Sequence, residues 1–599
     1  AACFVVLVAV RGPETMPQVA ARVEAMAAMP AEADAARAER SAPPAPVSAA
    51  AAVREHEASA RKIAPEPFLA NERLARFKVD ASKDVGTLKA RAATASRIGM
   101  EIQSIPASTG KAVTFGHAPA PAMNTEAYAY QAETGFVEAV LNPLSTFAID
   151  VDTASYANVR RFLNQGRLPP VDAVRIEELL NYFPYRYAAP AGDDPLGVTL
   201  EVAAAPWAPE HRLVRVGLKG REVTTGERPA ANLVFLLDVS GSMNQPNKLP
   251  LVQESLRLLV ARLRPDDRVA IVTYAGSSGL ALPSTPVARA AEILAAVAEL
   301  RPGGSTNGAM GIQLAYDIAK ANFAGGGINR VILCTDGDFN VGVTSEGELA
   351  RLIGEKAKSG VFLTVLGFGM GDYQDARLER LADQGNGHYG YIDSKREAEK
   401  LLVAQVNGTL VTVAKDVKVQ VEFNPARVAG YRLLGYENRR LAREDFNNDA
   451  VDAGELGAGH TVTALYEVVP AGRTLPETAQ VDALKYQRPD DSGRTSASDE
   501  LLTVKVRFKE PASDVSARRE WPLLDAGFGF AAASADFKFS AAVAGFGLLL
   551  RDSPHRGSAT WADVTAWAQA GLGDDAGGYR GEFLTLVEQA ADLSRGHAR

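Results

Sequence analysis

Between residues 229 and 407, short apolar segments alternate with amphipathic stretches, and this alternation constrains the fold more than any other feature of the chain. Strands that are buried on both faces consist of unbroken apolar runs, and parallel strands need helical connections between them. The pattern predicts an α/β fold, namely a doubly wound parallel sheet with helices on both faces. The apolar runs are Leu233 to Leu237, Val269 to Tyr274, Val331 to Cys334 and Val361 to Leu366, and the main helical stretches are 252–263, 288–300, 309–320 and 349–359.

The sequence on either side of this region follows other patterns. Residues 146–151 predict a short strand, two helices come next, and Asp152 or Thr153 is expected to cap the first. Further strands are predicted at 198–203, 213–218, 417–423, 461–469 and 502–508, and helices at 536–550, 561–568 and 581–593. We therefore expect a β-rich, sandwich-like region and a helical C-terminal tail to flank the α/β region. The strands before and after it are predicted to form one sandwich that the α/β region interrupts.

The first part of the chain lacks the pattern of a folded domain. Ala1 to Val10 is uniformly apolar but too short to span a bilayer, so we interpret residues 1–12 as the remnant of a membrane anchor or signal segment. From residue 20 to 60, 18 of 41 residues are alanine, which predicts a flexible linker over 13–123. The remaining expected units are 124–228, 229–407 and 408–599. This arrangement predicts an extracytoplasmic protein that only its N-terminal segment ties to the membrane.

Composition excludes several classes of function. The 599 residues include 64 Lys and Arg against 72 Asp and Glu, a formal net charge of −8, so a basic nucleic-acid-binding surface is not expected. The two cysteines, Cys3 and Cys334, supply neither a disulfide framework nor a Cys-rich zinc module. A lipid on Cys3 is the minor interpretation, since the residues after it are apolar rather than linker-like.

Polar residues follow the predicted strands where the strands end. Asp238, Ser240 and Ser242 come directly after the first strand, Thr306 precedes a helix in a Gly-Gly-Ser-Thr-Asn loop, and Asp336 follows the strand that ends at Cys334. In an open parallel sheet, ligands bind outside the carboxyl ends of the strands. Two carboxylates and three hydroxyls are hard oxygen donors, which select Mg²⁺, Mn²⁺ or Ca²⁺. The sequence therefore predicts a divalent-cation site at this edge.

The D-x-S-x-S, Thr and T-D-G set resembles the metal-ion-dependent adhesion site (MIDAS) of von Willebrand factor A (VWA) domains, and the flanks resemble the bacterial YfbK-like subgroup. The resemblance implies that Ser240, Ser242 and Thr306 are hydroxyl ligands of the metal. It implies that Asp238 and Asp336 bind the metal directly or through water. A protein partner then fills the open metal position with an acidic side chain, and the metal acts in binding rather than in catalysis.

Other motifs have simpler interpretations. Asp150 and Asp152 lie beside a helix start and are expected to cap it. The run Gly367, Gly369 and Gly371 lacks the dinucleotide spacing, and the turn after the first strand is acidic, so nucleotide binding is not expected. Asp338 is expected to be a turn residue. His388 is predicted to be structural, with no second histidine nearby to form a pair.

Three hypotheses for function remain open. The first is a non-enzymatic binding protein that holds an acidic residue of a partner through a divalent cation. The second is a metal-dependent phosphohydrolase, because doubly wound sheets also support phosphoryl transfer through an aspartate. The third is a scaffold in which the metal serves stability alone. No nucleophile–base pair is apparent, and the strand ends in D-V-S rather than in a D-x-D pair, which favours the first hypothesis.

Overall fold

The computed structural model describes residues 126–597 except 276–277, 305–307, 338–345, 371–373, 452 and 477–497. The predicted N-terminal segments 1–12 and 13–123 lie outside the described residues, and so do Thr306 and Asp338.

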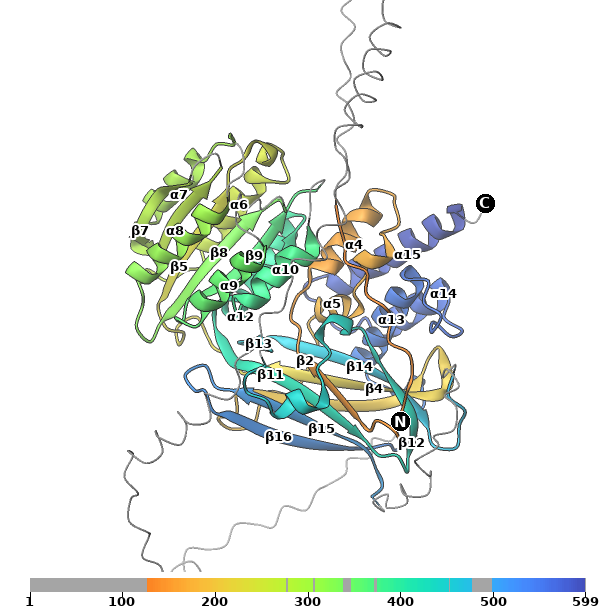
Figure 1. The fold of residues 1–599 in the computed structure, drawn as a ribbon. Coiled ribbons are helices and arrows are strands. Elements are labelled where there is room, and N and C mark those ends of the chain that lie inside the picture. The colour runs from red at the N-terminus through yellow and green to blue at the C-terminus, as the bar shows by residue number, and fades with distance from the viewer. Residues whose placement is uncertain are drawn as a thin grey trace, which may run out of the picture. The chain divides into compact units, whose positions relative to one another are not determined.

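Within the described residues, the α/β region forms a six-stranded sheet with the order β10-β9-β8-β5-β6-β7 (Figure 1). Its strands are β5 (Ala231–Asp238), β6 (Arg268–Tyr274), β7 (Ser278–Pro286), β8 (Ile328–Thr335), β9 (Phe362–Phe368) and β10 (Tyr389–Ile392). All neighbouring pairs are parallel except β6 and β7. The predicted parallel sheet is confirmed, and β7 adds an antiparallel edge. Pro283 and Pro286 suit that place, because a proline cannot donate to a second neighbouring strand.

Helices cover both faces of this sheet, as the apolar pattern of its strands requires. Leu233, Phe235 and Leu237 of β5 pack against α6 (Leu249–Val260) and α7 (Ala290–Glu299). Val234 and Leu236 point to the other face, where the core includes α8 (Gly308–Ala321), α9 (Glu346–Ala357) and α10 (Asp375–Gln384). Successive side chains of a strand point to opposite faces, so a strand buried on both sides must be apolar at every position.

The flanking strands form two antiparallel sheets (Figure 1). One contains β1 (Val137–Glu138), β12 (Val428–Leu434), β14 (Thr461–Pro470), β4 (Ala208–Gly220) and β3 (Leu196–Ala205). The other contains β13 (Gly454–Gly457), β11 (Thr412–Phe423), β15 (Glu500–Lys509) and β16 (Ser516–Leu524), with β2 (Leu144–Ala148) paired to β11. Strand β4, which precedes the α/β region, pairs with β14, which follows it, and both sheets share one core. The predicted interrupted sandwich is confirmed.

Helices from both ends of the described chain share another core. They are α4 (Ala154–Asn164), α5 (Ile176–Asn181), α13 (Ala535–Leu550), α14 (Trp561–Ala570) and α15 (Tyr579–His597). Their apolar side chains pack with Leu213 of β4 and Leu465 of β14, so they also contact the sandwich. The segments before and after the α/β region therefore fold together. Among the helices that the structure describes, none combines the length and apolar character needed to span a bilayer.

The predicted cap of α4 is wrong. Thr153 stands at the N-cap position, but its side chain makes no capping hydrogen bond. The Asp152 carboxylate instead accepts a hydrogen bond from the backbone N–H of Tyr389 on β10, with Oδ1 2.8 Å from the nitrogen. Asp150 accepts a hydrogen bond from the backbone N–H of Asp152 at 2.9 Å. A long-range contact with the α/β region thus replaces the local cap.

Candidate functional site

Asp238 is placed at the carboxyl edge of the central sheet because it is the last residue of β5. It is completely buried, and its Oδ1 accepts a hydrogen bond from the backbone N–H of Ser240 at 2.8 Å. Its Oδ2 is also buried, and the hydroxyl of Tyr274, the last residue of β6, lies close enough to the carboxylate to act as a further donor. Burial raises the pKa of Asp238 to about 6, while hydrogen bonds from Ser240 act in the opposite direction.

Ser240 and Ser242 lie beside each other in the loop after β5. Their hydroxyl oxygens are 2.9 Å apart, and a short 3-10 turn over Gly241–Met243 sets this spacing. The alternation in D-x-S-x-S therefore does bring both hydroxyls together, as the sequence predicts. Backbone hydrogen bonds from Gly241 to Gly304 and from Gly303 to Val239 hold the loop that leads toward Thr306 against this turn. Thr306 itself lies outside the described residues.

Asp336 follows β8, which is the parallel neighbour of β5, so both aspartates lie at one edge of the sheet. Asp336 is completely buried, and its Oδ2 accepts a hydrogen bond from Lys248 Nζ at 2.9 Å. Lys248 is itself 1% exposed and directly precedes α6. We call Asp238, Ser240, Ser242 and Asp336 the edge site. Lys248 is a functional neighbour of the edge site that the sequence motif does not identify.

A glycine gives Lys248 the room to reach Asp336. Gly369 follows β9 with φ at +77°, and a Cβ placed on it would lie 2.5 Å from both Cγ and Cε of Lys248. The glycine therefore serves the packing of a lysine rather than the binding of a phosphate. A lysine ten positions after the strand-end aspartate is the one sequence feature that points to this contact.

The residues of the edge site fit a hard divalent cation. All of their side-chain donors are oxygens, and hard cations prefer such ligands. Two buried carboxylates are costly unless cations or protons offset their charge, and at this edge Lys248 offsets only one of them. Lys248 offsets one of the two aspartate charges, so the protein leaves this edge with one net negative charge when all three groups are ionised.

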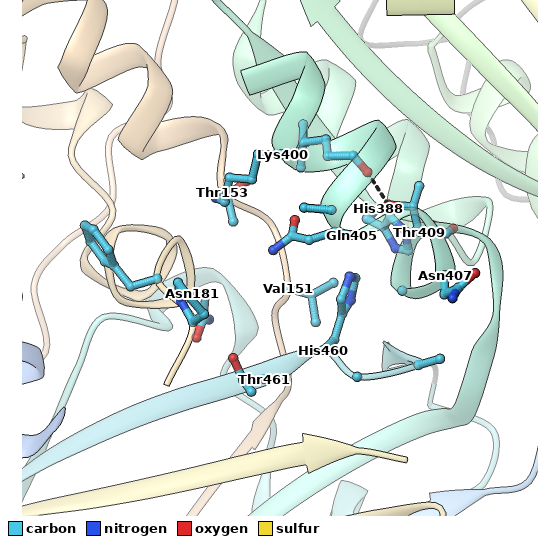
Figure 2. Close-up of a pocket in the computed structure, with 18 of the residues that line it drawn as sticks. Val151, Thr153, Asn181, His388, Lys400, Gln405, Asn407, Thr409, His460 and Thr461 are labelled. Carbon is cyan, nitrogen blue, oxygen red and sulfur yellow. Dashed lines mark hydrogen bonds between the residues drawn. The ribbon is translucent and has the colours of Figure 1, made fainter. Parts of the chain in front are cut away.

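A separate cavity of about 530 Å³ lies where the α/β region, the sandwich and the helices meet (Figure 2). The rings of His388 and His460 are 5.5 Å apart in its wall, so the prediction that no second histidine lies near His388 is wrong. His388 Nε2 lies 3.1 Å from the carbonyl oxygen of Thr409, which places the proton on Nε2. Burial lowers the pKa of His460 to about 4 and that of His388 well below its usual value, so both rings are neutral at pH 7. Two neutral imidazoles can accept hydrogen bonds but do not form an acid–base pair.

Family models cover most of the described chain. Residues 122–215 match the model described as "von Willebrand factor", residues 232–405 match "von Willebrand factor type A domain", and residues 408–593 match "Uncharacterized protein YfbK, C-terminal". Escherichia coli YfbK is 47% identical over 456 residues, which cover 75% of this chain and 78% of that protein. The chain belongs to the YfbK family of VWA-domain proteins. None of these three family descriptions names an enzyme.

Solved structures with a similar fold include other VWA proteins. A von Willebrand factor type A protein from Catenulispora acidiphila matches 63% of this YfbK relative and 87% of its own chain, with 14% identity and a TM-score of 0.36. Proximal thread matrix protein 1 of the mussel byssus, described with a zinc-occupied MIDAS motif, matches 30% of this chain and 45% of its own, with 23% identity and a TM-score of 0.25. VWA domains generally bind proteins, and some carry a MIDAS metal site.

Proposed function

We propose that this YfbK relative is a non-enzymatic binding protein whose edge site holds a divalent cation and, through it, an acidic side chain of a partner protein. The observation that carries the proposal is the convergence of Asp238, Ser240, Ser242 and Asp336 on one sheet edge, with both carboxylates completely buried. Thr306 is proposed as a further hydroxyl ligand. Mg²⁺ is the expected ion, and Mn²⁺ and Ca²⁺ have the same ligand preference.

Charge explains why an acidic partner suits this site. When bound, a divalent cation supplies positive charge and an open position for an oxygen ligand. Asp238 and Asp336 supply two negative charges, and the Lys248 ammonium offsets one of them at 2.9 Å. The protein therefore does not neutralise a divalent ion completely, and a carboxylate from a partner completes the balance.

The first experiment is a calorimetric titration of residues 124–599 with Mg²⁺ and Mn²⁺. We expect saturable binding in the wild type and none in Asp238→Ala. Asp317→Ala is the matched control, because Asp317 is an exposed aspartate of α8 in the same domain. Equal binding by the wild type and Asp238→Ala would contradict the proposed metal site.

A second experiment tests the chemistry of the partner. Random peptides are selected on the immobilised protein in Mg²⁺ and, separately, in chelator. We expect enrichment of Asp- or Glu-containing peptides in Mg²⁺ only, and its loss with Asp238→Ala. Enrichment of the same peptides in chelator would show that binding does not depend on the metal.

We further propose that the protein acts outside the cytoplasm, tied to the membrane through its N-terminal segment. The support is the apolar run Ala1 to Val10 and the alanine-rich tract that follows it. Protease treatment of intact cells and of cells with a permeabilised envelope tests the location. Protection of the protein after outer-envelope permeabilisation, with digestion only after complete lysis, would contradict it.

A further inference from the structure

A second group of buried carboxylates lies between the VWA domain and the N-terminal segment. Its members are Asp150 and Asp152, which follow β2, Glu178 of α5, and Asp375, Glu379 and Asp383 of α10. We call these six residues the seam cluster. Five of them are at most 6% exposed, and the Asp383 side chain is 36% exposed.

Two arginines hold the seam cluster together but do not balance its charge. Arg175 forms ion pairs with Glu178, Asp375 and Glu379. Arg439 contacts four carboxylates, those of Asp150, Asp152, Glu379 and Asp383, at 2.8 to 3.5 Å. Two guanidinium groups against six carboxylates leave an excess of four negative charges when all are ionised. Charges that are buried without partners are strongly unfavourable, so this excess needs protons or a further cation.

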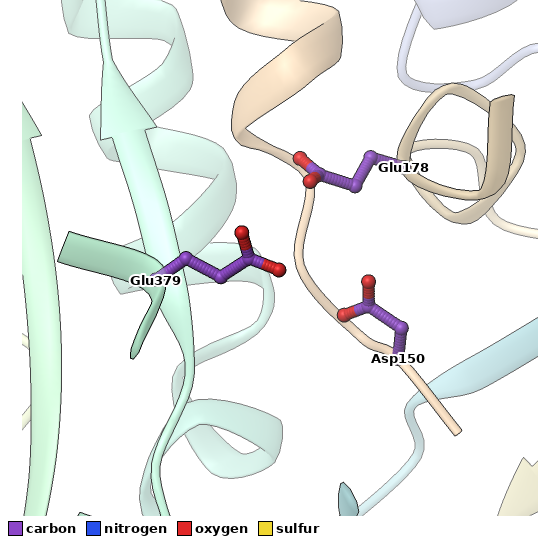
Figure 3. Close-up of side chains that lie close together, drawn as sticks. All are labelled: Asp150, Glu178 and Glu379. Atoms are coloured by element: carbon purple, nitrogen blue, oxygen red, sulfur yellow. The ribbon is translucent and has the colours of Figure 1, made fainter. Parts of the chain in front are cut away.

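Three of these carboxylates converge closely enough to share one ion. Asp150, Glu178 and Glu379 each offer an oxygen, and these oxygens lie within 4.8 Å of one another. Figure 3 shows the three carboxylates directed toward a common space. Oxygen ligands lie about 2.3 to 2.6 Å from Ca²⁺, so two of them are separated by at most about 5 Å. The observed spacing is therefore within the span of one calcium coordination shell.

Among the oxygens of these three carboxylates, one is buried and has no donor within the described part of the chain. Glu178 accepts hydrogen bonds from Arg175 and from the backbone N–H of Ser155. Glu379 accepts hydrogen bonds from Arg175, Asn438 and Arg439. Asp150 Oδ2 is different: Asp150 is 3% exposed, and this oxygen has no hydrogen-bond donor among the described residues. A buried anionic oxygen without a donor, in a cluster with excess negative charge, points to a missing cation.

We propose that Asp150, Glu178 and Glu379 form a Ca²⁺ site that ties the VWA domain to the N-terminal segment. Ca²⁺ is favoured over Mg²⁺ because it accepts irregular oxygen shells, whereas Mg²⁺ requires near-octahedral geometry and keeps its waters. The ligands come from three separate elements, and only one of these, α10, belongs to the VWA domain. Calcium therefore stabilises the attachment of the domain that carries the edge site.

The test uses the Asp238→Ala chain, so that the seam cluster is measured without the edge site and independently of the proposed function. Calcium bound after equilibrium dialysis is counted by atomic emission. We expect one Ca²⁺ per chain, with binding at least tenfold weaker after a second substitution, Asp150→Asn. Asp193→Asn, an exposed aspartate of the same segment, is the control and should bind as Asp238→Ala does. Unchanged affinity in the Asp150→Asn chain, or no Ca²⁺ bound at millimolar concentration, would overturn the site and leave shared protons as the explanation.

Two further measurements cover the case in which Asp150→Asn does not fold. Glu379→Gln, made in the same Asp238→Ala background, removes a proposed ligand from the other side of the seam and should weaken binding equally. Thermal unfolding of the Asp238→Ala chain should shift upward in Ca²⁺ and much less in Mg²⁺. Equal shifts by the two ions would contradict a calcium-selective site.

Discussion

The edge site and the seam cluster both gather buried carboxylates, but they differ in charge balance and in origin. The edge site has two aspartates and two serine hydroxyls, with Lys248 beside them, and the aspartates lie at the carboxyl ends of neighbouring strands of one sheet. The seam cluster has six carboxylates and two arginines, drawn from elements on both sides of a domain boundary.

The difference indicates that buried carboxylates can serve two purposes in one protein. A site whose charge is nearly balanced, at the edge of a sheet, suits reversible contact with a carboxylate of another protein. A site with a large internal excess of charge, buried between domains, suits a permanently held ion that joins them. The two sites therefore predict different consequences when each loses its own cationic side chain.

The largest effect is expected at Arg439. Its guanidinium contacts four carboxylates, and Arg439→Met leaves them without this partner. Removing one side of a buried ion pair costs about 3 to 5 kcal/mol, and we expect a loss of stability near 4 kcal/mol in chelator. Denaturant unfolding measures it, with the exposed Arg440→Met as the control. If both variants were equally stable, the seam cluster would not depend on its arginines.

The next largest effect is a pH dependence of the free energy of unfolding, which arises from a residue beside the seam cluster. Burial raises the pKa of Glu177 to about 8, and the carboxylates of Glu437, Asp150 and Glu178 that face it act in the same direction. The folded state therefore holds a proton that the unfolded state releases, so this group destabilises the fold as pH rises from about 5 toward 8, at most by about 1.4 kcal/mol per pH unit. Glu177→Gln replaces the titrating carboxyl with an amide and therefore removes this contribution to the pH dependence.

The comparison of Glu177→Gln with the wild type is needed because other groups titrate in the same range. His388 and His460, whose pKa values are lowered by burial, give the opposite slope between about pH 4 and 6.5. Relative to the wild type, Glu177→Gln should gain stability with rising pH, by about 3 kcal/mol between pH 5 and 7. A pH-independent difference, measured by denaturant unfolding in chelator, would show that Glu177 keeps an ordinary pKa in the folded protein.

A smaller effect on stability than that of Arg439 is expected at Lys248. There the direction of the change in metal affinity is the informative result. Lys248→Met removes the partner of buried Asp336 and should cost about 3 kcal/mol without metal, the lower end of the range for a buried ion pair. The edge site then carries one more net negative charge, so Mg²⁺ should bind at least tenfold more tightly in a calorimetric titration. Lys395→Met, an exposed lysine paired with Glu254, is the control. Weaker Mg²⁺ binding in Lys248→Met would mean that the lysine positions Asp336 for the metal rather than competing with it.

The smallest effect on stability is expected at Ser242. Its hydroxyl contacts Ser240 at 2.9 Å and is partly exposed, so Ser242→Ala should change the free energy of unfolding by less than about 1 kcal/mol. Loss of a proposed hydroxyl ligand should nevertheless weaken Mg²⁺ binding by about tenfold. A variant that binds Mg²⁺ as the wild type does would remove Ser242 from the ligand set.

Much of the fold could be predicted from the sequence because local patterns determine it. The apolar runs of β5, β8 and β9 fix strands that are buried on both faces, and the positions of Asp238 and Asp336 directly after two of these strands place both at one edge. The D-x-S-x-S alternation predicts the contact between Ser240 and Ser242. In each case the information lies within a few residues of the element that uses it.

The remaining contacts depend on tertiary packing that no local pattern encodes. Asp150 and Asp152 look like helix caps in the sequence, yet Asp152 bonds to Tyr389, 237 positions away, and Arg439 contacts both aspartates. Lys248 looks like an ordinary helix-start lysine until Gly369 gives it room to reach Asp336. In both examples, charged side chains contact elements that are distant in sequence. Local sequence patterns carry no information about such contacts.

The most direct test of the proposed function is a crystal structure of the protein soaked in Mn²⁺, with data collected for anomalous scattering. We predict an anomalous peak bound by Asp238, Ser240, Ser242 and Asp336, and its absence in crystals of Asp238→Ala. A map without a peak at this edge at saturating Mn²⁺, with Lys248 still bound to Asp336, would contradict the claim that the edge site holds a divalent cation.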